Sequence, residues 1–552
     1  MENHNKIFFH PAYTAGRIDR RLFGAFLEPI GNWVYGGIWN NEHPTADEYG
    51  FRKDIMDMTR ELGVPAVRLP GGNFTSGWNW KDSIGPRENR RTHLELAWRQ
   101  YETNDIGHDE YLAWAKSVGT DPLYTVNLGT GTVEDAQYLA EYTRHPGGTY
   151  WSDLRRKNGF EKPHAVHTWC LGNEMDGPWQ IHSWEKDPKG YGVKSNEISK
   201  MIKWVDPTAE TVVCGTSTPH NRSYLSWDLT VLEQCYETVD YLSLHYYHPA
   251  LTGDLKAYLS ASDVCEDFLI REIAACDVMQ GMLREPRPLM IAFDEYGVSF
   301  RKQEKTTVGR AGNIDHSAYS EFGSRLKQPF KHNSLHPSQT RNDGVESEML
   351  ESLALCSILM MLMRHADRVK IGCMTPGLFV IGHNEEKVWK RVGYYAYEML
   401  IRYGSRGFSL TPSISCGTYD TDGYNIDDFS QVPAQEGLKY LESSASLDPA
   451  SRELSVFVIN RSCDQDLETQ LDLTSFGDLS LIEHKSVYTD DLSVCNTAEN
   501  PECVVPKKIE NTKLSSGVAT AVFKKLSFNM LRFRLNRAVL PRQHSHPPGF
   551  ML

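Results

Sequence analysis

The stretch Trp169-Cys-Leu-Gly-Asn173-Glu174-Met-Asp-Gly-Pro-Trp179 is a short apolar run that stops on an Asn-Glu pair and then turns. A buried parallel strand ends in this way at the carboxyl edge of its sheet, where α/β barrels carry their functional side chains. A second stretch, Pro288-Leu-Met-Ile-Ala-Phe-Asp-Glu295-Tyr-Gly297, repeats the pattern. The two stretches predict two strands of one parallel sheet, each with a carboxylic acid at its end.

Strand-like and helix-like segments alternate on both sides of these stretches. Helical spacing is clearest where Ile55, Met58 and Leu62 recur and Gly63 closes the run. We expect strands at 22–28, 66–73, 122–128, 169–174, 211–216, 239–247, 288–297 and 369–374, and helices near 51–62, 109–118, 133–145, 193–205, 263–281 and 346–365. Eight strands alternating with helices are typical of the (β/α)8 barrel class of α/β folds, which we assign to residues 23–400.

The pattern changes after the barrel to short alternating segments separated by Asp, Gly, Ser and Asn. This pattern is typical of an antiparallel β-sandwich, which we place at 401–540. The extended segment 1–22 is expected to pack with the sandwich, and 541–552 to form a flexible tail. The polar stretch 301–343 predicts a long loop on the functional face, a lid or a partner surface, with disorder as the alternative.

Composition excludes several classes of function. The 58 basic and 72 acidic side chains give a net charge of −14, which argues against a nucleic-acid partner and favours a neutral or weakly charged substrate. Neither a signal-like N-terminal segment nor an apolar stretch of about 18 residues occurs, so we expect a cytoplasmic protein without a membrane segment. No CxxC or Cys/His cluster suggests a metal, and no cofactor is expected. Four of the 11 cysteines lie in apolar runs and are expected to be buried thiols, namely Cys170, Cys214, Cys356 and Cys373.

Two carboxylic acids at strand ends are the minimum equipment for cleaving a glycosidic bond. A retaining glycosidase holds one carboxyl protonated to donate to the leaving oxygen, and another ionised, roughly 5 to 5.5 Å away, to attack the anomeric carbon. Glu174 and Glu295 end the fourth and seventh predicted strands, so they can converge at the barrel mouth. The alternative is that each Glu pairs with a surface Arg or Lys. Two such residues on the expected strands favour the catalytic interpretation.

Several short sequence motifs follow one another along the barrel. They are Phe23-Gly-Ala-Phe-Leu-Glu28, Arg68-Leu-Pro-Gly-Gly-Asn73-Phe, Gly77-Trp-Asn-Trp-Lys-Asp-Ser-Ile-Gly-Pro86, Leu96-Ala-Trp98, Glu102-Thr-Asn-Asp-Ile-Gly, the motif around Glu174 extended to Gln180, Ser243-Leu-His245 and Arg364-His-Ala-Asp-Arg-Val-Lys-Ile371. In this order they resemble the family-51 glycoside hydrolases, the α-L-arabinofuranosidases. Through Phe457-Val-Ile-Asn-Arg-Ser462 the resemblance reaches the sandwich.

This resemblance implies a retaining exo-glycosidase that removes terminal non-reducing α-L-arabinofuranosyl residues from arabino-oligosaccharides by double displacement. It also implies a homo-oligomer, often a hexamer. By position, Glu174 would be the acid/base and Glu295 the nucleophile. Asn173 would hydrogen-bond the sugar 2-hydroxyl, an interaction that strengthens at the oxocarbenium-like transition state.

The resemblance implies further substrate-binding residues around this pair. Glu28 and Asn73 would hold the furanose ring or the carboxylates, and Tyr247 would orient the nucleophile. Arg68 would join them or would equally form a buried structural ion pair. Trp98 would form an apolar wall near the leaving group, or would equally be a core side chain.

Two positions depart from the family pattern. Tyr296 follows the nucleophile where members commonly have Trp, and Met374-Thr-Pro-Gly377 follows the eighth strand where they commonly carry a sugar-contacting Gln. The walls of the sugar pocket are therefore expected to differ from the usual ones. The same mechanism on another glycone, such as a β-D-galactofuranoside, a xyloside or a glucan, stays open. A non-catalytic carbohydrate-binding protein is the alternative from another class, and the retained pair of Glu residues speaks against it.

Overall fold

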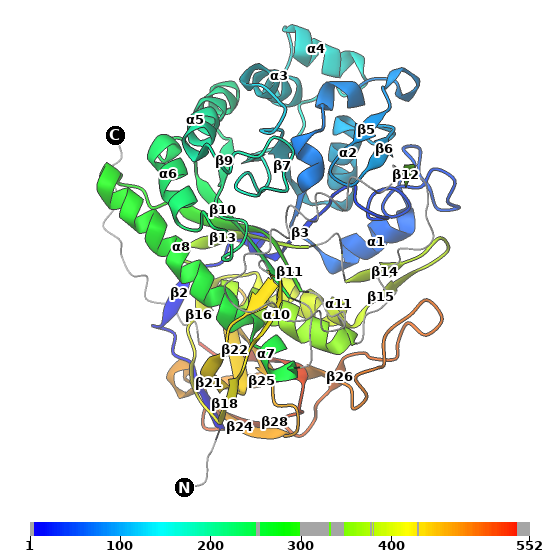
Figure 1. Ribbon diagram of the computed structural model, residues 1–552. Helices are drawn as coiled ribbons and strands as arrows, with labels where there is room; N and C mark the ends of the chain where they lie inside the picture. Colours follow the sequence, from blue (N-terminus) through cyan, green and yellow to red (C-terminus); the bar gives the residue numbers. More distant parts are fainter. Residues whose placement is uncertain are drawn as a thin grey trace.

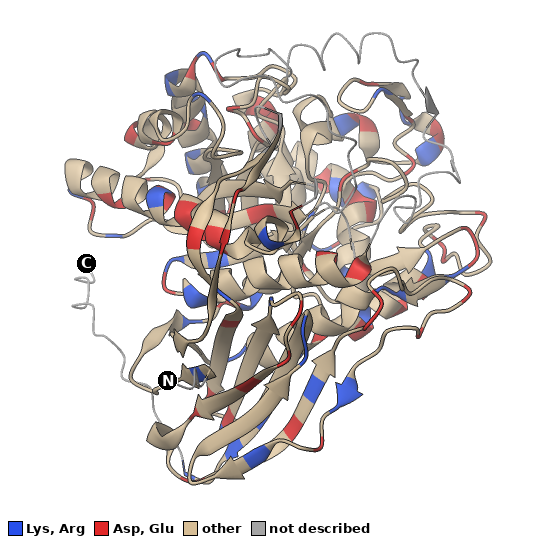
Figure 2. Ribbon diagram, turned by 60° about the horizontal axis from the view of Figure 1, so that its bottom comes forward, with Lys and Arg blue, Asp and Glu red and all other residues tan. Residues whose placement is uncertain are grey.

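The computed structural model describes residues 5–249, 254–298, 331–332, 347–375, 378, 380–427 and 430–537. An α/β barrel packs against a β-sandwich, and α10 (Glu348–Arg364) and α11 (Val392–Met399) lie between them (Figure 1). In this part of the chain, every helix is too short or too polar to cross a bilayer. In the view of Figure 2, basic residues are interspersed with acidic ones over both domains.

Eight parallel strands close into the predicted barrel. Their order around the barrel follows the chain: β3 (Gly24–Phe26), β4 (Ala66–Arg68), β7 (Asp121–Val126), β8 (Thr168–Leu171), β9 (Glu210–Cys214), β10 (Tyr241–His248), β11 (Met290–Val298) and β13 (Val369–Met374). Each overlaps one strand expected from the sequence. The (β/α)8 prediction is therefore confirmed, and the strand ends meet at one face of the barrel.

Buried, mostly apolar side chains fill the barrel interior. Because side chains alternate along a strand, Ala292 of β11 points inward while Ile291 and Phe293 pack against the surrounding helices. The buried interior cluster consists of Phe26, Ala66, Leu123, Cys170, Val212, Tyr241, Ala292, Ile371 and Cys373. All eleven cysteines are free thiols, and the four expected to be buried are buried. The polar residues at the strand ends thus lie above a packed barrel interior.

Helices cover the outside of the barrel. Those predicted from periodicity are α1 (Lys53–Leu62), α2 (His108–Val118), α3 (Val133–Arg144), α5 (Pro188–Val205), α8 (Ala261–Leu283) and α10. The sequence interpretation missed α4 (Tyr150–Lys157), α6 (Ser226–Cys235), α7 (Leu255–Tyr258) and α11. On α6 the buried face includes the polar Asp228 beside Trp227 and Val231, which blurs the apolar period that would have identified a helix.

Two sheets form the sandwich. The larger has the order β2-β16-β22-β23-β29-β25-β26 and the smaller β17-β1-β24-β28-β27. Their strands are β1 (Asn5–Phe8), β2 (Thr14–Arg17), β16 (Phe408–Leu410), β17 (Ser413–Ser415), β22 (Leu441–Asp448), β23 (Glu453–Asn460), β24 (Leu467–Asp472), β25 (Leu479–Val487), β26 (Lys507–Lys508), β27 (Lys513–Ser515), β28 (Val518–Phe523) and β29 (Ser527–Leu535). The C-terminal strands pair antiparallel as predicted, whereas β1 runs parallel to β24.

Other sequence-based expectations fall on residues that are not described. The segment 301–343 lies outside the described residues except for β12 (Lys331–His332), which pairs with β6 (Gln100–Glu102). The tail 541–552 lies outside them as well. The domain boundaries drawn at residues 22, 400 and 540 stay predictions.

Candidate active site

The ends of β8, β10 and β11 bring Glu174, His245 and Glu295 together at the barrel mouth. One side-chain ligand atom from each of the three lies within 4.8 Å of the others. Nδ1 of His245 is 3.1 Å from Oε1 of Glu174 and 3.6 Å from Oε2 of Glu295. The close approach of the two carboxylates suits double displacement, because inverting glycosidases separate their carboxyl groups by roughly 6.5 to 9.5 Å.

A β-bulge in β11 turns two consecutive acids toward the barrel interior. Ser243 of β10 pairs with Ala292, but His245 pairs with Glu295, so β11 carries one residue more than its neighbour. The register against β13 shifts over the same residues. A regular strand would point Asp294 and Glu295 to opposite faces, whereas a bulge re-aims one side chain. Both carboxylates therefore reach the same cation.

That cation is Arg68, which ends β4 and is fully buried. Its Nε lies 3.0 Å from Oδ2 of Asp294, and a terminal nitrogen donates to Oε1 of Glu295 at 2.5 Å. The other terminal nitrogen donates to Oδ1 of Asn173 at 3.0 Å. Burial alone would raise the pKa of Asp294, but Arg68 and His245 lower it to about 2. Arg68 thus forms the buried ion pair considered above and also contacts the candidate nucleophile.

Glu295 is held by charges on one side and a phenol on the other. Burial raises its pKa, and the positive charges of His245 and Arg68 oppose this rise. The hydroxyl of Tyr247 donates to Oε2 of Glu295 at 2.6 Å. The Tyr247 side chain is 44% exposed, so it borders the open mouth.

Glu174 is bracketed by two donors. The indole Nε1 of Trp179 donates to Oε2 at 2.6 Å, and His245 contacts Oε1. Burial lowers the pKa of His245, but Glu295, Asp294 and Glu174 together raise it to about 10. The imidazole is therefore a cation at neutral pH, and it offsets part of the charge of the carboxylates around it.

An amide network joins the ends of β4 and β8. Nδ2 of Asn173 donates to Oδ1 of Asn73 at 2.9 Å, and Gln180 donates to the same oxygen. Ser76 in turn donates to Oε1 of Gln180 at 2.7 Å. The orientation of Asn173 is thus fixed from both sides, by Asn73 and by Arg68.

Glu28 approaches the same mouth from the end of β3. It is buried, and its Oε1 accepts from the Phe74 N–H at 3.0 Å and from Nε1 of Trp98 at 2.6 Å. Burial and the charge of Glu295 raise its pKa. The loop packs so tightly here that a Cβ on Gly72 (φ +74°) would lie 2.0 Å from the Glu28 carboxyl carbon. Trp98 is therefore tied to a polar strand end rather than buried in the core.

The seven site residues predicted from the sequence all lie around this mouth, whereas Tyr296 does not. Tyr296 is fully buried, and its hydroxyl lies 3.1 Å from that of Tyr397, behind the strand. The expectation that Tyr296 alters the pocket wall is wrong, because the bulge directs this side chain away from the mouth. Sequence reasoning missed the contacts of His245, Trp179 and Gln180. The sequence could have indicated two of them, since Trp179 and Gln180 belong to the same sequence motif as Glu174.

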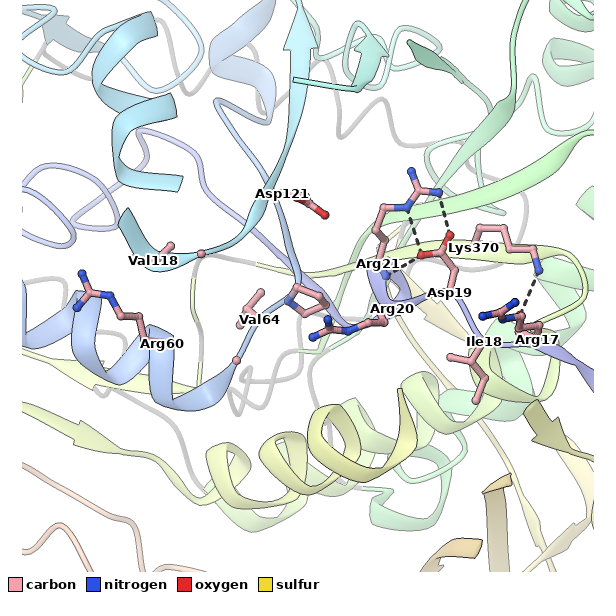
Figure 3. A pocket seen from close by; sticks show the side chains of 13 residues that line it. Arg17, Ile18, Asp19, Arg20, Arg21, Arg60, Val64, Val118, Asp121 and Lys370 are labelled. Carbon is pink, nitrogen blue, oxygen red and sulfur yellow. Dashed lines mark hydrogen bonds and ion pairs between the residues drawn. The ribbon is translucent and has the colours of Figure 1, made fainter. Parts of the chain in front are cut away.

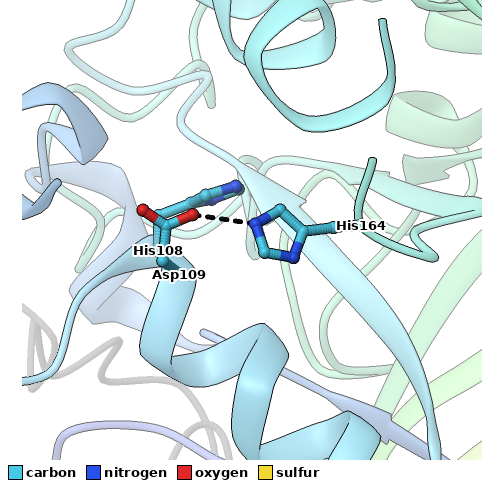
Figure 4. Close-up of side chains that lie close together, drawn as sticks. All are labelled: His108, Asp109 and His164. Atoms are coloured by element: carbon cyan, nitrogen blue, oxygen red, sulfur yellow. Dashed lines mark hydrogen bonds and ion pairs between the residues drawn. The ribbon is translucent and has the colours of Figure 1, made fainter. Parts of the chain in front are cut away.

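A second acid and imidazole group, His108, Asp109 and His164, forms a polar network at the N-terminus of α2, which begins at His108 (Figure 4). Nδ1 of His108 lies 2.7 Å from the Tyr124 hydroxyl, and Nε2 lies 3.1 Å from Oγ1 of Thr143. Nε2 of His164 contacts Oδ1 of Asp109 at 2.8 Å. Burial lowers the pKa of His108 to about 3. Both ring nitrogens of His108 are engaged, so these residues form a structural network rather than a metal centre.

A cavity of about 790 Å³ lies at the opposite end of the barrel, where the strands begin (Figure 3). Three of its cations are engaged: Arg21 pairs with Asp19, Arg60 donates to the Ser117 carbonyl, and Lys370 donates to the Arg17 carbonyl at 3.4 Å. Helices α1 and α2 also end here, and cations near helix C-termini are stabilising. This face of a barrel usually serves stability, and we interpret the lining in that way.

Comparison with known proteins agrees with the geometry. A model described as the α-L-arabinofuranosidase 1 domain matches residues 58–262, and one described as the α-L-arabinofuranosidase C-terminal domain matches 294–527. The intracellular exo-α-(1→5)-L-arabinofuranosidase 1 of Bacillus subtilis is 37% identical over 526 residues, 95% of this chain and 97% of the relative. The chain belongs to the family-51 α-L-arabinofuranosidases.

Other relatives extend this likeness. The exo-α-(1→6)-L-arabinofuranosidase of Bifidobacterium longum is 33% identical, with 93% of each chain covered. The solved structure of AbfB, a family 51 α-L-arabinofuranosidase from Bifidobacterium longum, aligns with a TM-score of 0.83 at 29% identity, covering 97% of this chain and all of that one. The arabinose complex of the Thermotoga maritima α-L-arabinofuranosidase aligns with a TM-score of 0.79 at 26% identity over 96% and 99% of the two chains.

Proposed function

We propose that this protein is a retaining exo-α-L-arabinofuranosidase that removes terminal non-reducing arabinofuranosyl residues from arabino-oligosaccharides. The observation that carries the proposal is the close approach of Glu174 and Glu295, each held by its own donors at the barrel mouth. The names of the Bacillus and Bifidobacterium relatives support the choice of glycone.

In the first step, Glu295 attacks the anomeric carbon while Glu174 gives its proton to the departing glycosidic oxygen. The C–O bond to the leaving group breaks and an ester bond to Glu295 forms. In the second step, the Glu174 carboxylate takes a proton from water, whose oxygen attacks the same carbon and releases Glu295. Two inversions give net retention.

The surrounding residues bind and orient the sugar. Asn173, fixed between Arg68 and Asn73, faces the sugar 2-hydroxyl, where its hydrogen bond strengthens at the transition state. Glu28 and Asn73 bind the other ring hydroxyls. Trp98 lines the leaving-group side, and Tyr247 keeps the nucleophile in its attacking orientation.

Positive charge around the nucleophile supports its role. Burial works against ionisation of Glu295, but Arg68 and His245 oppose that effect. An ionised carboxylate in a dry site is a better nucleophile than one solvated by water. Glu174 contacts His245 through one oxygen only and is more accessible, as expected for a group that exchanges protons with substrate and water.

A panel of p-nitrophenyl glycosides tests the function. We expect hydrolysis of the α-L-arabinofuranoside to exceed that of the β-D-galactofuranoside, the xyloside and the glucoside. Glu295→Ala should lower every measurable rate by several orders of magnitude while the protein stays folded. If Glu295→Ala kept a tenth of the rate on an activated aryl glycoside, the nucleophile would be misassigned. A preference for another glycone would favour the second candidate, and absence of any rate would favour a non-catalytic binding protein.

We also propose a cytoplasmic homo-oligomer. Relatives named intracellular support the location. The oligomer is supported by an apolar stripe on α8, where Ile270, Val278 and Met282 are exposed at helical spacing. Light scattering after size exclusion should show several copies per particle. Val278→Asp should reduce their number if α8 forms the interface.

A further inference from the structure

Asp176 fixes the turn that carries Glu174. It is fully buried, two residues beyond the candidate acid/base. Its Oδ2 accepts from the backbone N–H of Ser217 at 3.0 Å, from the Ser217 hydroxyl at 3.1 Å and from Nδ2 of Asn221 at 2.7 Å. Asn221 also donates to the backbone carbonyl of Asp176 at 3.1 Å. Four hydrogen bonds thus join this turn to the loop that follows β9.

The turn needs such support because its backbone is unusual. Glu174 has φ +46°, a left-handed conformation that costs energy for any residue except glycine, and Gly172 has φ +96°. The Gly177 N–H donates to the Glu174 carbonyl at 2.8 Å and closes the turn. Strained backbone persists only where surrounding contacts determine it.

We propose that Asp176 is a positioning residue for the acid/base: by binding Ser217 and Asn221 it holds the Glu174 carboxylate between Trp179 and His245. This inference rests on the proposed function. Within the part of the chain that the structure describes, Asp176 makes no hydrogen bond to the side chain of Glu174 or of Glu295, so it acts through the backbone of the turn. Its loss should therefore impair proton transfer rather than nucleophilic attack.

The proposal depends on an acceptor at this position more than on a negative charge. Among the described residues, Oδ1 of Asp176 has no hydrogen-bond partner, and all the donors converge on Oδ2. Burial raises the pKa of Asp176 to about 7, although the Ser217 donors favour the ionised form. An Asn side chain can present the same acceptor oxygen to the same donors.

Leaving-group dependence separates a positioning role from a merely structural one. In Asp176→Ala, kcat/KM for a dinitrophenyl arabinofuranoside should stay near the wild-type value, because that leaving group departs without protonation. The value for an unactivated arabino-oligosaccharide should fall by roughly 10²-fold, the low end of what general acid catalysis contributes. Azide, which needs no general base, should raise kcat of the variant on the activated substrate. Asp176→Asn should behave almost like the wild type.

Three further variants make the outcome decisive. Asn221→Ala removes two of the four hydrogen bonds. It should show the same difference between activated and unactivated substrates, but a smaller one, and it replaces Asp176→Ala as the test if that variant does not fold. Asp109→Asn changes an equally buried acid in the network of Figure 4. It should lower stability without any difference in effect between activated and unactivated substrates. Glu174→Ala is the benchmark for the full signature.

The results discriminate the inference from the function on which it rests. If Glu174→Ala lacks this difference between substrates and the azide rescue, the acid/base assignment itself fails. If Glu174→Ala shows both but folded Asp176→Ala loses activity equally on both substrates, or keeps it on both, the positioning role of Asp176 is overturned.

Discussion

Tyr247→Phe removes one hydroxyl from the active site and tests how the nucleophile is held. That hydroxyl donates to Oε2 of Glu295 at 2.6 Å. A hydrogen bond to a charged group contributes about 1.5 to 3 kcal/mol. Because the Tyr247 side chain is 44% exposed, the lower end applies, about 1.5 kcal/mol. We therefore expect a roughly tenfold loss of kcat/KM, since about 1.4 kcal/mol corresponds to a factor of ten.

The pH dependence gives this prediction its sign. The Tyr247 hydrogen bond lowers the pKa of Glu295, so its removal should raise that pKa. The acidic limb of kcat/KM against pH, measured on p-nitrophenyl α-L-arabinofuranoside, should move to higher pH. Tyr246→Phe is the matched control, because its hydroxyl contacts His248 at 2.9 Å within the core. Tyr246→Phe should lower the melting temperature and leave the pH dependence of kcat/KM unchanged. An unchanged kcat/KM and acidic limb in Tyr247→Phe would refute the reasoning.

Three other changes have expected outcomes. Gly72→Ala should abolish most activity, because its Cβ would collide with the Glu28 carboxylate, and a loss below threefold in kcat/KM would contradict the tight packing. Trp179→Phe should lower kcat/KM on unactivated substrates roughly tenfold by removing the donor to Glu174, while dinitrophenyl substrates should be spared; equal losses on both would count against it. Folding raises the pKa of His245 from its ordinary value of 6.5 to about 10. The protonated imidazole therefore contributes its full stabilisation below pH 6.5, and this contribution is lost as the pH rises through about 10. Thermal unfolding from pH 6 to 10.5 should show a decline that His245→Gln makes shallower.

Strand periodicity was sufficient to predict the barrel and the place of its acids. Apolar runs ending on Glu174 and Glu295 are a one-dimensional signal of a parallel strand and its C-terminal end, and both acids lie where that signal puts them. The bulge in β11 carries no such signal, because an extra residue is defined only by the register of the neighbouring strands. The sequence therefore did not show that the Tyr296 side chain points away from the mouth.

Long-range hydrogen bonds were the other limit of sequence reasoning. Asp176 follows Glu174 closely, but its partners come from the loop after another strand, and nothing in the local sequence couples them. The helix α6 was missed for a related reason. Its buried Asp228 accepts from the Thr216 N–H and hydroxyl, so a polar residue lies where the apolar period requires an apolar one.

The strand β1 has a consequence for how the molecule assembles. It lies between β17 and β24, pairing Lys6 with both Ser415 and Gln470, so one sheet of the sandwich joins segments from opposite ends of the barrel sequence. During synthesis, β1 cannot pair with β17 or β24 until the whole barrel has been translated. Strand pairings between residues this distant in sequence form slowly. A fragment beginning at the sandwich would expose the edge of β24 as a template for other chains. Its aggregation should be relieved by a peptide of residues 5–9 supplied in trans.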